Sequence, residues 1–402
     1  MRAFERFLNY AVIHTRSDET SASTPSTDRQ FTLANRLAEE LRALGVPDAA
    51  VDERCYVYAS LPATPGLEEV PAVGFIAHMD TAHYEAGHVR PRLHPDYDGG
   101  AVQLEGRVLS PEMFPHLPGL KGQTLITAAG DTLLGADDKA GIAEIMTMVE
   151  RLQAEGLPHG RVCVGFTPDE EIGRGADHFD IARFGAETAY TVDGGAAGEI
   201  SFENFNAAGA EVTVHGVDVH PGSSKDVMVN ALLVGMAFHA LLPAGETPRD
   251  TEGYEGFYHL MQMEGGATQA RLRYIVRDHD AASFQKRLDT LRCAAETLNR
   301  QWGAGTVELE ITEQYRNMAE IIRTRPELIE RARRAARKAG LTPRVNPIRG
   351  GTDGAQLSFR GLPCPDLGTG GYAYHGPFEH ITAEAMDRVA EMLVILVTEE
   401  FV

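Results

Sequence analysis

The chain has 402 residues, 43% hydrophobic and 24% charged, which is the balance of an ordinary soluble globular protein. Its formal net charge of −21 argues against nucleic acid as a partner, because binding phosphates needs a basic face. No apolar run is long enough to span a membrane, and residues 1–7 lack the apolar core of a signal peptide. We therefore expect a cytoplasmic protein of about two domains, with neither membrane nor nucleic acid among its partners.

The cysteines are few and scattered, and no Cys-x-x-Cys pair occurs. This pattern predicts reduced, mostly buried thiols and argues against a zinc site built on cysteine. The four cysteines are Cys55, Cys163, Cys293 and Cys364.

The N-terminal third predicts a helix over 4–14, a loop over 17–26 and a second helix that ends at Gly45. The run from Thr27 to Gln30 has the spacing of a capping box and predicts where the second helix begins. Residues 56–59 and 73–77 predict strands, and the second of these is wholly apolar, as in a strand buried on both faces. Residues 85–130 are rich in Gly and Pro and predict short strands and turns.

Further apolar strands are expected at 161–166 and 188–192, and a helix from Ala140 is closed by Gly156. Strands that alternate with helices predict a doubly wound α/β sheet. Ligands of such sheets bind outside the carboxyl ends of the strands. The side chains expected at those ends are His78, Asp80, Glu170, Glu171 and Asp193.

From 209 the pattern changes to strand, helix, two strands, helix and strand, which is the ferredoxin-like order. The expected elements are strands at 210–216, 256–264, 270–277 and 306–312, with helices at 227–242 and 281–302. We predict that 209–320 form a smaller α+β domain inserted into a catalytic domain made of 1–208 and 321–402. Helices at 327–339 and 383–401 complete the larger domain.

The stretch from Thr132 to Gly141 predicts a tight loop that leads into the helix from Ala140. Adjacent carboxylates at a helix start are common caps, and for this stretch alone the cap is the better interpretation. The other acids and histidines expected at the same edge of the sheet change that balance. Asp137 then becomes a candidate carboxylate shared by two metal ions.

Two motifs offer further groups, each with an ordinary alternative. In His78-Met79-Asp80 a carboxylate two residues from a histidine can fix the ring of a metal ligand. A strand-end histidine in a routine hydrogen bond is the more frequent case for such a tripeptide. In Glu170-Glu171 one carboxylate can bind a metal while its neighbour serves as general base, although for an isolated pair a solvated acidic helix start is the better interpretation.

Three more positions complete the candidates. Asp193-Gly194 offers a carboxylate at a turn, although Asp before Gly is also a plain turn signal. His375 lies in a glycine-rich loop, and spacing does not separate it from His380. His220 lies in the expected insertion, where it either closes over a site or marks a turn. The set supplies nitrogen and oxygen ligands without cysteine, as in a two-zinc site bridged by one carboxylate.

Over nearly its whole length the chain resembles the peptidase T family of tripeptide aminopeptidases. These are two-zinc exopeptidases related to carboxypeptidase G and succinyl-diaminopimelate desuccinylase. Strings of this length in this order are highly specific. They are AHMDT at 77–81, LGADDKAG at 134–141, FTPDEE at 166–171, TVDGG at 191–195, HPG at 220–222, TEGYEGFYHL at 251–260 and RGGTDGAQLSF at 349–359.

The resemblance implies two Zn²⁺ per subunit, with Co²⁺ or Mn²⁺ as substitutes. One ion would be bound by His78, Asp137 and Asp193, and the other by Asp137, Glu171 and His375. Glu170 would be the general base and Asp80 would orient His78. The resemblance favours His375 over His380, because the family's last metal histidine stands in a Tyr-His-Gly string.

The resemblance also implies how the peptide is held. Arg277 would grip a substrate carboxylate, a task that suits a planar, permanently charged guanidinium. His220 would support the developing oxyanion, from its own chain or from a partner in a homodimer formed through the insertion. Arg349, which opens the last string, is a third candidate for substrate binding. His83 and Tyr84 depart from the family pattern, as does the stretch 377–380, and both departures bear on substrate preference.

The mechanism expected from this site is hydrolysis of a peptide bond by metal-activated water, with Glu170 taking the proton. An N-acyl amino acid deacylase or a carboxypeptidase would use the same ligands on a different bond. A non-catalytic protein on the same fold would be favoured by loss of Glu170 or of a ligand, and all of these residues are present.

Overall fold

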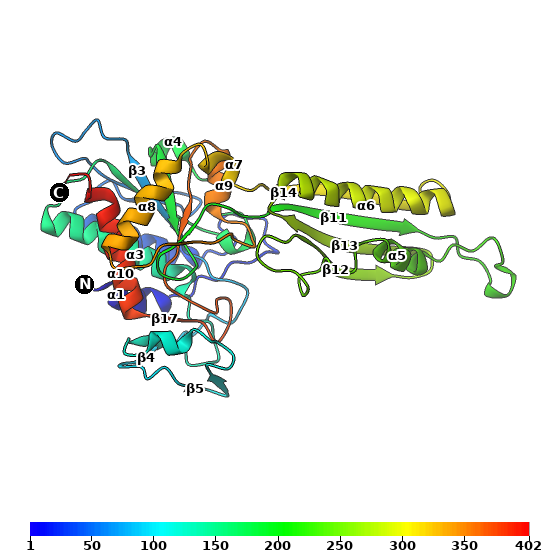
Figure 1. The fold of residues 1–402 in the computed structure, drawn as a ribbon, viewed down its shortest axis with the longest axis horizontal. Coiled ribbons are helices and arrows are strands. Elements are labelled where there is room, and N and C mark those ends of the chain that lie inside the picture. The colour runs from blue at the N-terminus through cyan, green and yellow to red at the C-terminus, as the bar shows by residue number, and fades with distance from the viewer. Residues whose placement is uncertain (402) are drawn as a thin grey trace. The chain divides into compact units, whose positions relative to one another are not determined.

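The structure is a computed structural model, and it describes residues 1–401 (Figure 1). The chain divides into two compact units, each of which is described by itself. The first unit comprises Met1–Phe202, Glu320–Asn346 and Thr352–Val402, and the second comprises Glu203–Ala319 and Pro347–Gly351.

The first unit contains an eight-stranded sheet in the order β1-β2-β8-β3-β9-β16-β10-β15. Its centre is parallel, since β3 pairs in parallel with both β8 and β9, and β9 with β16. Antiparallel strands flank this centre, so the sheet is mixed. The strands are β1 (Ala50–Val51), β2 (Val57–Leu61), β3 (Val73–His78), β8 (Val162–Thr167), β9 (Thr188–Val192), β10 (Glu199–Ser201), β15 (Arg344–Val345) and β16 (Asp366–Leu367).

Every residue of the three central strands is buried, which agrees with their largely apolar sequences. Helices cover both faces of the sheet. Phe184 of α4 (Ile181–Phe184) and Leu357 of α9 (Asp353–Phe359) pack with Ile76 on one face. On the other, Tyr190 of β9 donates its hydroxyl hydrogen to the carbonyl oxygen of Leu328 in α8 (Pro326–Lys338). This arrangement confirms the predicted α/β class with helices on both faces.

The remaining elements of the first unit lie around this sheet. The excursion after β3 forms a two-stranded hairpin, β5 with β6, and contributes β4 and β7 to a three-stranded sheet in the order β17-β7-β4, whose strand β17 comes from the C-terminal part of the chain. The helices are α1 (Ala3–Ala11), α2 (Gln30–Ala43), α3 (Ala136–Glu155) and α10 (Ala383–Thr398), with the one-turn α7 (Ala319–Ile322) and the 3₁₀ turns Leu117–Leu120 and Glu170–Ile172. The strands are β4 (Arg92–His94), β5 (Val102–Leu104), β6 (Arg107–Leu109), β7 (Leu125–Thr127) and β17 (His380–Thr382).

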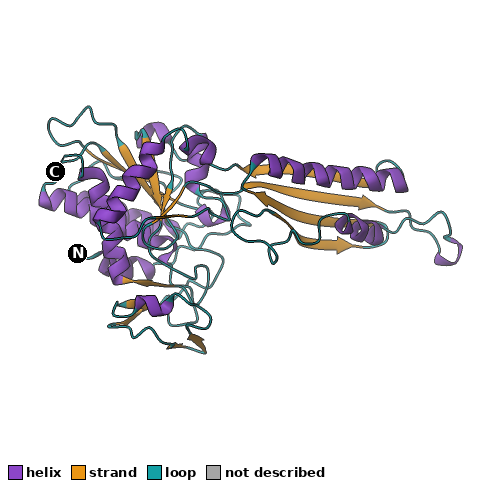
Figure 2. Ribbon diagram, in the orientation of Figure 1, coloured by secondary structure: helices purple, strands orange, loops and turns teal. Residues whose placement is uncertain are grey.

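The second unit is a four-stranded antiparallel sheet in the order β12-β13-β11-β14. Chain order and sheet order together give the ferredoxin-like topology expected from the sequence. Figure 2 shows its long strands in orange and its helices in purple. The elements are β11 (Asn206–His215), α5 (Ala231–Ala240), β12 (Phe257–Gly265), β13 (Gln269–Asp278), α6 (Ala281–Trp302), β14 (Val307–Tyr315) and the 3₁₀ turn Pro221–Ser223.

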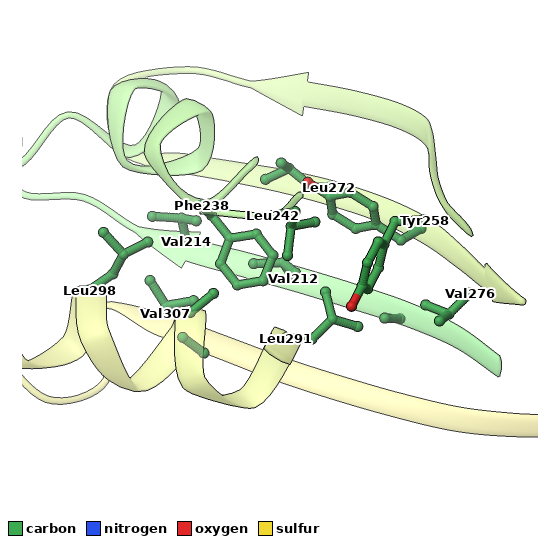
Figure 3. Packing of buried hydrophobic residues seen from close by; sticks show 14 of the residues in the cluster. Val212, Val214, Phe238, Leu242, Tyr258, Leu272, Val276, Leu291, Leu298 and Val307 are labelled. Carbon is green, nitrogen blue, oxygen red and sulfur yellow. The ribbon is translucent and has the colours of Figure 1, made fainter. Parts of the chain in front are cut away.

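The core of the second unit lies between one face of this sheet and the two helices (Figure 3). Alternate residues of β11 and β13, such as Val212 and Leu272, point into it, as period-two strands require. Phe238 of α5 and Leu291 of α6 pack on them. Only one face of this sheet is buried, so apolar and polar residues alternate along its strands. The central strands of the first unit are buried on both faces, and their sequences do not alternate in this way.

Several boundary predictions need correction. The second unit begins at Glu203 and not at 209, because Asn204 and Asn206 donate side-chain hydrogen bonds to the carbonyl oxygens of Arg316 and Asp278. It also takes in 347–351, since the ring of His279 lies 3.1 Å from the carbonyl oxygen of Ile348.

The helix expected over 227–242 spans only Ala231–Ala240, because Val229 pairs with Val217 in an isolated bridge and Asn230 caps the helix. The last helix likewise ends at Thr398, before the expected 401.

The capping box expected at Thr27 was wrong. α2 begins at Gln30, and its cap residue Arg29 makes no side-chain cap hydrogen bond. Thr27 donates its hydroxyl hydrogen to the carbonyl oxygen of Arg16, and the Gln30 amide binds Asp169. The polar side chains at this helix start are therefore used in tertiary contacts.

Within residues 1–401, no helix combines the length and the apolar character needed to cross a membrane.

Candidate metal centre

His78 is the last residue of β3, and its side chain is almost fully buried. Its Nδ1 lies 3.1 Å from the main-chain oxygen of Asp80 and 3.5 Å from the Asp80 carboxylate. Its Nε2 lies 2.8 Å from Oδ1 of Asp137 and 3.8 Å from Oδ1 of Asp193. Asp80 thus fixes one side of the ring, while the other side faces two acids.

Asp137 lies in the turn that leads into α3, where its backbone is not helical (φ −87°, ψ 105°). Its two carboxylate oxygens contact different histidines. Oδ1 lies 2.8 Å from Nε2 of His78, and Oδ2 lies 3.0 Å from Nε2 of His375. One carboxylate therefore stands between two histidines that are nearly three hundred positions apart in the chain.

Asp193 follows β9 and Glu171 follows β8, so the parallel strands deliver both to the same edge of the sheet. Oε2 of Glu171 lies 3.0 Å from Nε2 of His375. Among residues 1–401, two groups of three residues have ligand atoms within 4.8 Å of one another, and both contain Asp137. They are His78, Asp137 and Asp193, and Asp137, Glu171 and His375.

Spacing alone left His375 and His380 as alternatives, of which the resemblance favoured His375, and the structure places the two apart. The side chain of His375 is 54% exposed and contacts Asp137 and Glu171. His380 is fully buried in β17, and its Nε2 lies 2.8 Å from Nε2 of His116. His375 is therefore the one that lies with the acids.

The pair Glu170-Glu171 forms a single 3₁₀ turn whose start is held from two sides. The Asp80 carboxylate accepts the backbone N–H of Glu170 at 2.9 Å and that of Glu171 at 3.2 Å. Asp169, which precedes them with a left-handed φ of 59°, accepts hydrogen bonds from the backbone and hydroxyl of Ser26 and from the Gln30 amide. These contacts fix the direction in which the two glutamates leave the strand.

Close approach of α3 to the sheet brings the Asp137 turn beside Asp193. Gly141 permits this approach, because a Cβ at that position would lie only 1.9 Å from the carbonyl oxygen of Val192 in β9. Asp138 strengthens the turn, since its carboxylate accepts the backbone N–H groups of His78 and Gly141.

Crowding of acids shifts the pKa values in this site. Desolvation raises the pKa of Glu170 well above its usual value, and the charge of Asp193 acts in the same direction. Desolvation likewise raises the pKa of Asp193. The carboxylates of Asp137 and Glu171 raise the pKa of His375 to about 11. Divalent cations would displace these protons, because metal ligands bind in their deprotonated forms.

The side chains present fit a pair of cations. Two imidazoles and three carboxylates supply nitrogen and oxygen ligands of the kinds that zinc accepts. Oε1 of Glu171 is buried and has no hydrogen-bond partner among the described residues, so it is an acceptor still to be satisfied. The geometry therefore supports a candidate metal site at the predicted position.

The predicted substrate-binding residues all lie in the second unit. His220 is exposed in a turn, where its Nδ1 accepts the backbone N–H of Gly222. Arg277 donates to the carbonyl oxygens of Ala208 and Val276 and lies over the ring of Tyr315. Their predicted roles toward a peptide stay predictions.

Arg349 is committed to contacts within its own unit. Its Nη1 donates to the carbonyl oxygens of Gly253 and Glu255, and its Nη2 donates to Oγ1 of Thr251 at 3.0 Å. Its guanidinium also lies over the ring of Phe205. These hydrogen bonds hold the loop 251–256 in place. The sequence did not predict this role for Arg349.

Several residues around the centre were missed as well. Glu379 accepts backbone hydrogen bonds from the Asp137 turn, and Asp353 is buried with one oxygen bonded to Thr167. Asp353 stands in the string 349–359, and Glu379 stands in the stretch 377–380 that departs from the family pattern. Nothing local marks them, because each acts on a segment far away in the chain.

The chain is also similar to known proteins over most of its length. The model of peptidase family M20/M25/M40 matches residues 133–399. The chain is 47% identical over 399 residues to a protein named Peptidase T from Alkaliphilus oremlandii, covering 98% of each. It is 50% identical over 398 residues to a Peptidase T from Desulfitobacterium hafniense, covering 98% of this chain and 97% of that one.

Solved structures share the fold. Aminopeptidase PepT from Bacillus cereus superposes with a TM-score of 0.79 at 22% identity, covering 99% of this chain and 98% of that one. A Bacillus subtilis protein, YXEP, described as a dinuclear metal-binding peptidase of family M20, superposes with a TM-score of 0.67 at 15% identity over similar coverage. On the strength of the family match and the close relatives, this chain belongs to the peptidase family M20/M25/M40.

Proposed function

We propose that this protein is a metal-dependent aminopeptidase that releases the N-terminal residue from tripeptides. The observation that carries the proposal is the Asp137 carboxylate, whose two oxygens face His78 and His375. Relatives named Peptidase T, at 47–50% identity over nearly the whole chain, support the choice of substrate.

The metal centre is proposed to hold two Zn²⁺ ions. His78, Asp137 and Asp193 would bind one, and Asp137, Glu171 and His375 the other. Nitrogen and oxygen donors without cysteine also suit Co²⁺ or Mn²⁺ as substitutes. When bound, such ions polarise the scissile carbonyl and lower the pKa of a water molecule.

Glu170 is proposed as the general base. Its carboxylate would take the proton of the attacking water and pass it to the leaving amine. Desolvation raises the pKa of Glu170, the direction that makes its carboxylate a stronger base. Asp80 would position both Glu170 and His78. Its carboxylate accepts the backbone N–H of Glu170 and lies beside the ring of His78.

The second unit is proposed to act as a lid that recognises the peptide. Arg277 would bind its C-terminal carboxylate, and His220 would support the oxyanion. For Arg349 we propose an indirect role, because its N–H groups already hold the loop 251–256. With such a lid, the rate of hydrolysis would depend on the length of the peptide.

A homodimer through the second unit is a further proposal. α5 exposes Leu233 and Met236, and β12 is an edge strand that exposes Met261. Exposed apolar side chains beside an open strand edge suit self-association. We also place the protein in the cytoplasm, which its free cysteines support.

The test is hydrolysis of a matched set of peptides by the purified, metal-loaded protein. We expect release of the N-terminal residue from a free tripeptide, little cleavage of its N-acetylated form, and slower cleavage of the dipeptide and tetrapeptide. A chelator should abolish the activity and added Zn²⁺ restore it, with two ions bound per chain. Preferred cleavage of N-acyl amino acids would show a deacylase, and release of the C-terminal residue would show a carboxypeptidase.

A further inference from the structure

Glu379 is an almost fully buried glutamate, with 1% of its surface exposed, that precedes β17. Its carboxylate accepts three backbone N–H groups from the turn before α3. Oε2 accepts those of Leu134 at 2.7 Å and Gly135 at 2.9 Å, and Oε1 accepts that of Asp137 at 3.0 Å. A buried carboxylate is costly unless it is hydrogen-bonded, and here one short turn supplies all three bonds.

The turn needs such a partner because it is not helical. Gly135 has a left-handed φ of 79°, and both Asp137 and Asp138 depart from helical angles. N–H groups at the start of a helix have no partners within it, and here they converge on one acceptor from another segment. Glu379 therefore fixes the path of the backbone that carries the Asp137 side chain.

Glu379 also connects this turn to His375. Glu379 lies four positions after the histidine, and its backbone N–H donates to the carbonyl oxygen of Gly376. His375 itself has a left-handed φ of 62°, so the short segment 375–379 is sharply turned. The segment 375–379 thus supplies the candidate metal ligand His375 at one end. At its other end it supplies Glu379, which supports the turn that carries Asp137.

We propose that Glu379 is a positioning residue of the metal centre, which holds Asp137 where its two oxygens reach both histidines. This inference rests on the proposed two-metal function. It predicts that Glu379 controls metal affinity without touching a metal, as residues that orient ligands commonly do.

The test compares Glu379→Gln with Glu384→Gln. Glu384 is a matched control, because its carboxylate also accepts hydrogen bonds, from the backbone N–H and hydroxyl of Thr124. Metal affinity is measured by competition with a chromophoric chelator, alongside thermal unfolding of the metal-free proteins. We expect E379Q to bind Zn²⁺ roughly 10- to 100-fold more weakly. The affinity of E384Q should stay within about twofold of wild type, since it leaves the turn untouched.

Activity gives a second readout. At limiting Zn²⁺ the kcat of E379Q should fall, and excess Zn²⁺ should restore much of it, whereas a loss of fold would not respond to metal. If E379Q does not fold, the Zn²⁺ affinity of Glu379→Asp tests the inference. It keeps the charge but shortens the side chain, and its Zn²⁺ affinity should also fall below that of wild type.

Unchanged Zn²⁺ affinity in a folded Glu379 variant, even with lower thermal stability, would overturn the inference and leave the two-metal function standing. If the wild type itself binds no metal and hydrolyses no peptide, the proposed function fails instead.

Discussion

The carboxylate of Asp80 accepts the backbone N–H of Glu170 at 2.9 Å, across 90 positions of the chain. The same carboxylate lies 3.5 Å from Nδ1 of His78. One acid therefore positions both the proposed base and a proposed metal ligand, and its effects on the two should be separable.

Replacing Asp80 with Asn should weaken both contacts, since an amide carries no charge and offers only one acceptor oxygen. We expect metal affinity and kcat/KM each to fall roughly 10- to 100-fold. Asp180→Asn is the control, because that carboxylate caps α4 instead. Chelator competition and steady-state kinetics measure the two effects. A D80N protein with wild-type kinetics would remove Asp80 from the mechanism.

Glu170→Gln should lower kcat by about 10²- to 10⁴-fold, the usual contribution of a general base. Metal content should stay at the wild-type level, because Glu170 belongs to neither ligand group. Glu187→Gln, a change at an exposed glutamate, is the control. Loss of metal together with loss of rate would show instead that Glu170 is a ligand.

Arg277→Ala should raise KM for a free tripeptide by roughly 10- to 100-fold, the range expected for a lost hydrogen bond to a charged group. A tripeptide amide, which lacks the carboxylate, should be cleaved equally by wild type and variant. Arg273 on the same strand bonds Gln262 and provides the control. The clamp is rejected if the variant and the wild type show the same preference for the free acid.

His380 should make the stability of the folded protein fall at acidic pH. Desolvation lowers its pKa from 6.5 to about 4, and the ring packs against His116, Phe114 and Tyr372. A depressed folded pKa means that the unfolded chain binds the proton more tightly. The stability contributed by the neutral ring is therefore complete above about pH 6.5 and is lost as the pH falls toward 4.

From these two pKa values the free energy of unfolding should drop by about 2 kcal/mol between neutral pH and pH 5 on account of His380. Urea unfolding at both pH values measures this difference. His380→Asn should be less stable at neutral pH but should show a smaller drop. An equal drop in both proteins would mean that His380 does not titrate in this way.

Gly141→Ala should disturb the packing of α3 on β9. The added Cβ would lie 1.9 Å from the carbonyl oxygen of Val192, so the helix must shift. We expect a loss of about 1–3 kcal/mol in the free energy of unfolding and weaker metal binding, because Asp137 moves with the helix. Gly119 has nothing within 4 Å of an added Cβ, so Gly119→Ala should be nearly neutral.

Much of the fold was predictable because its signals are local. The largely apolar runs of β3, β8 and β9 predict buried strands, and parallel strands place their carboxyl ends together. His78, Glu171 and Asp193 were therefore expected near one another before any coordinates. The helix starts were less predictable, since Val229 pairs with Val217 before α5 and the Gln30 side chain at the start of α2 binds Asp169.

By itself the sequence determined which chemical groups are available and which strand ends carry them, because hydrophobic period and residue type are properties of neighbouring positions. Residue spacing left His375 and His380 as alternatives, and the tertiary structure places His375 with Asp137 and His380 with His116. It also decided that Glu379 holds the Asp137 turn and that Ser26 holds Asp169. Such bonds join segments more than a hundred positions apart, and their energy depends on distance and direction in space, which no local pattern encodes.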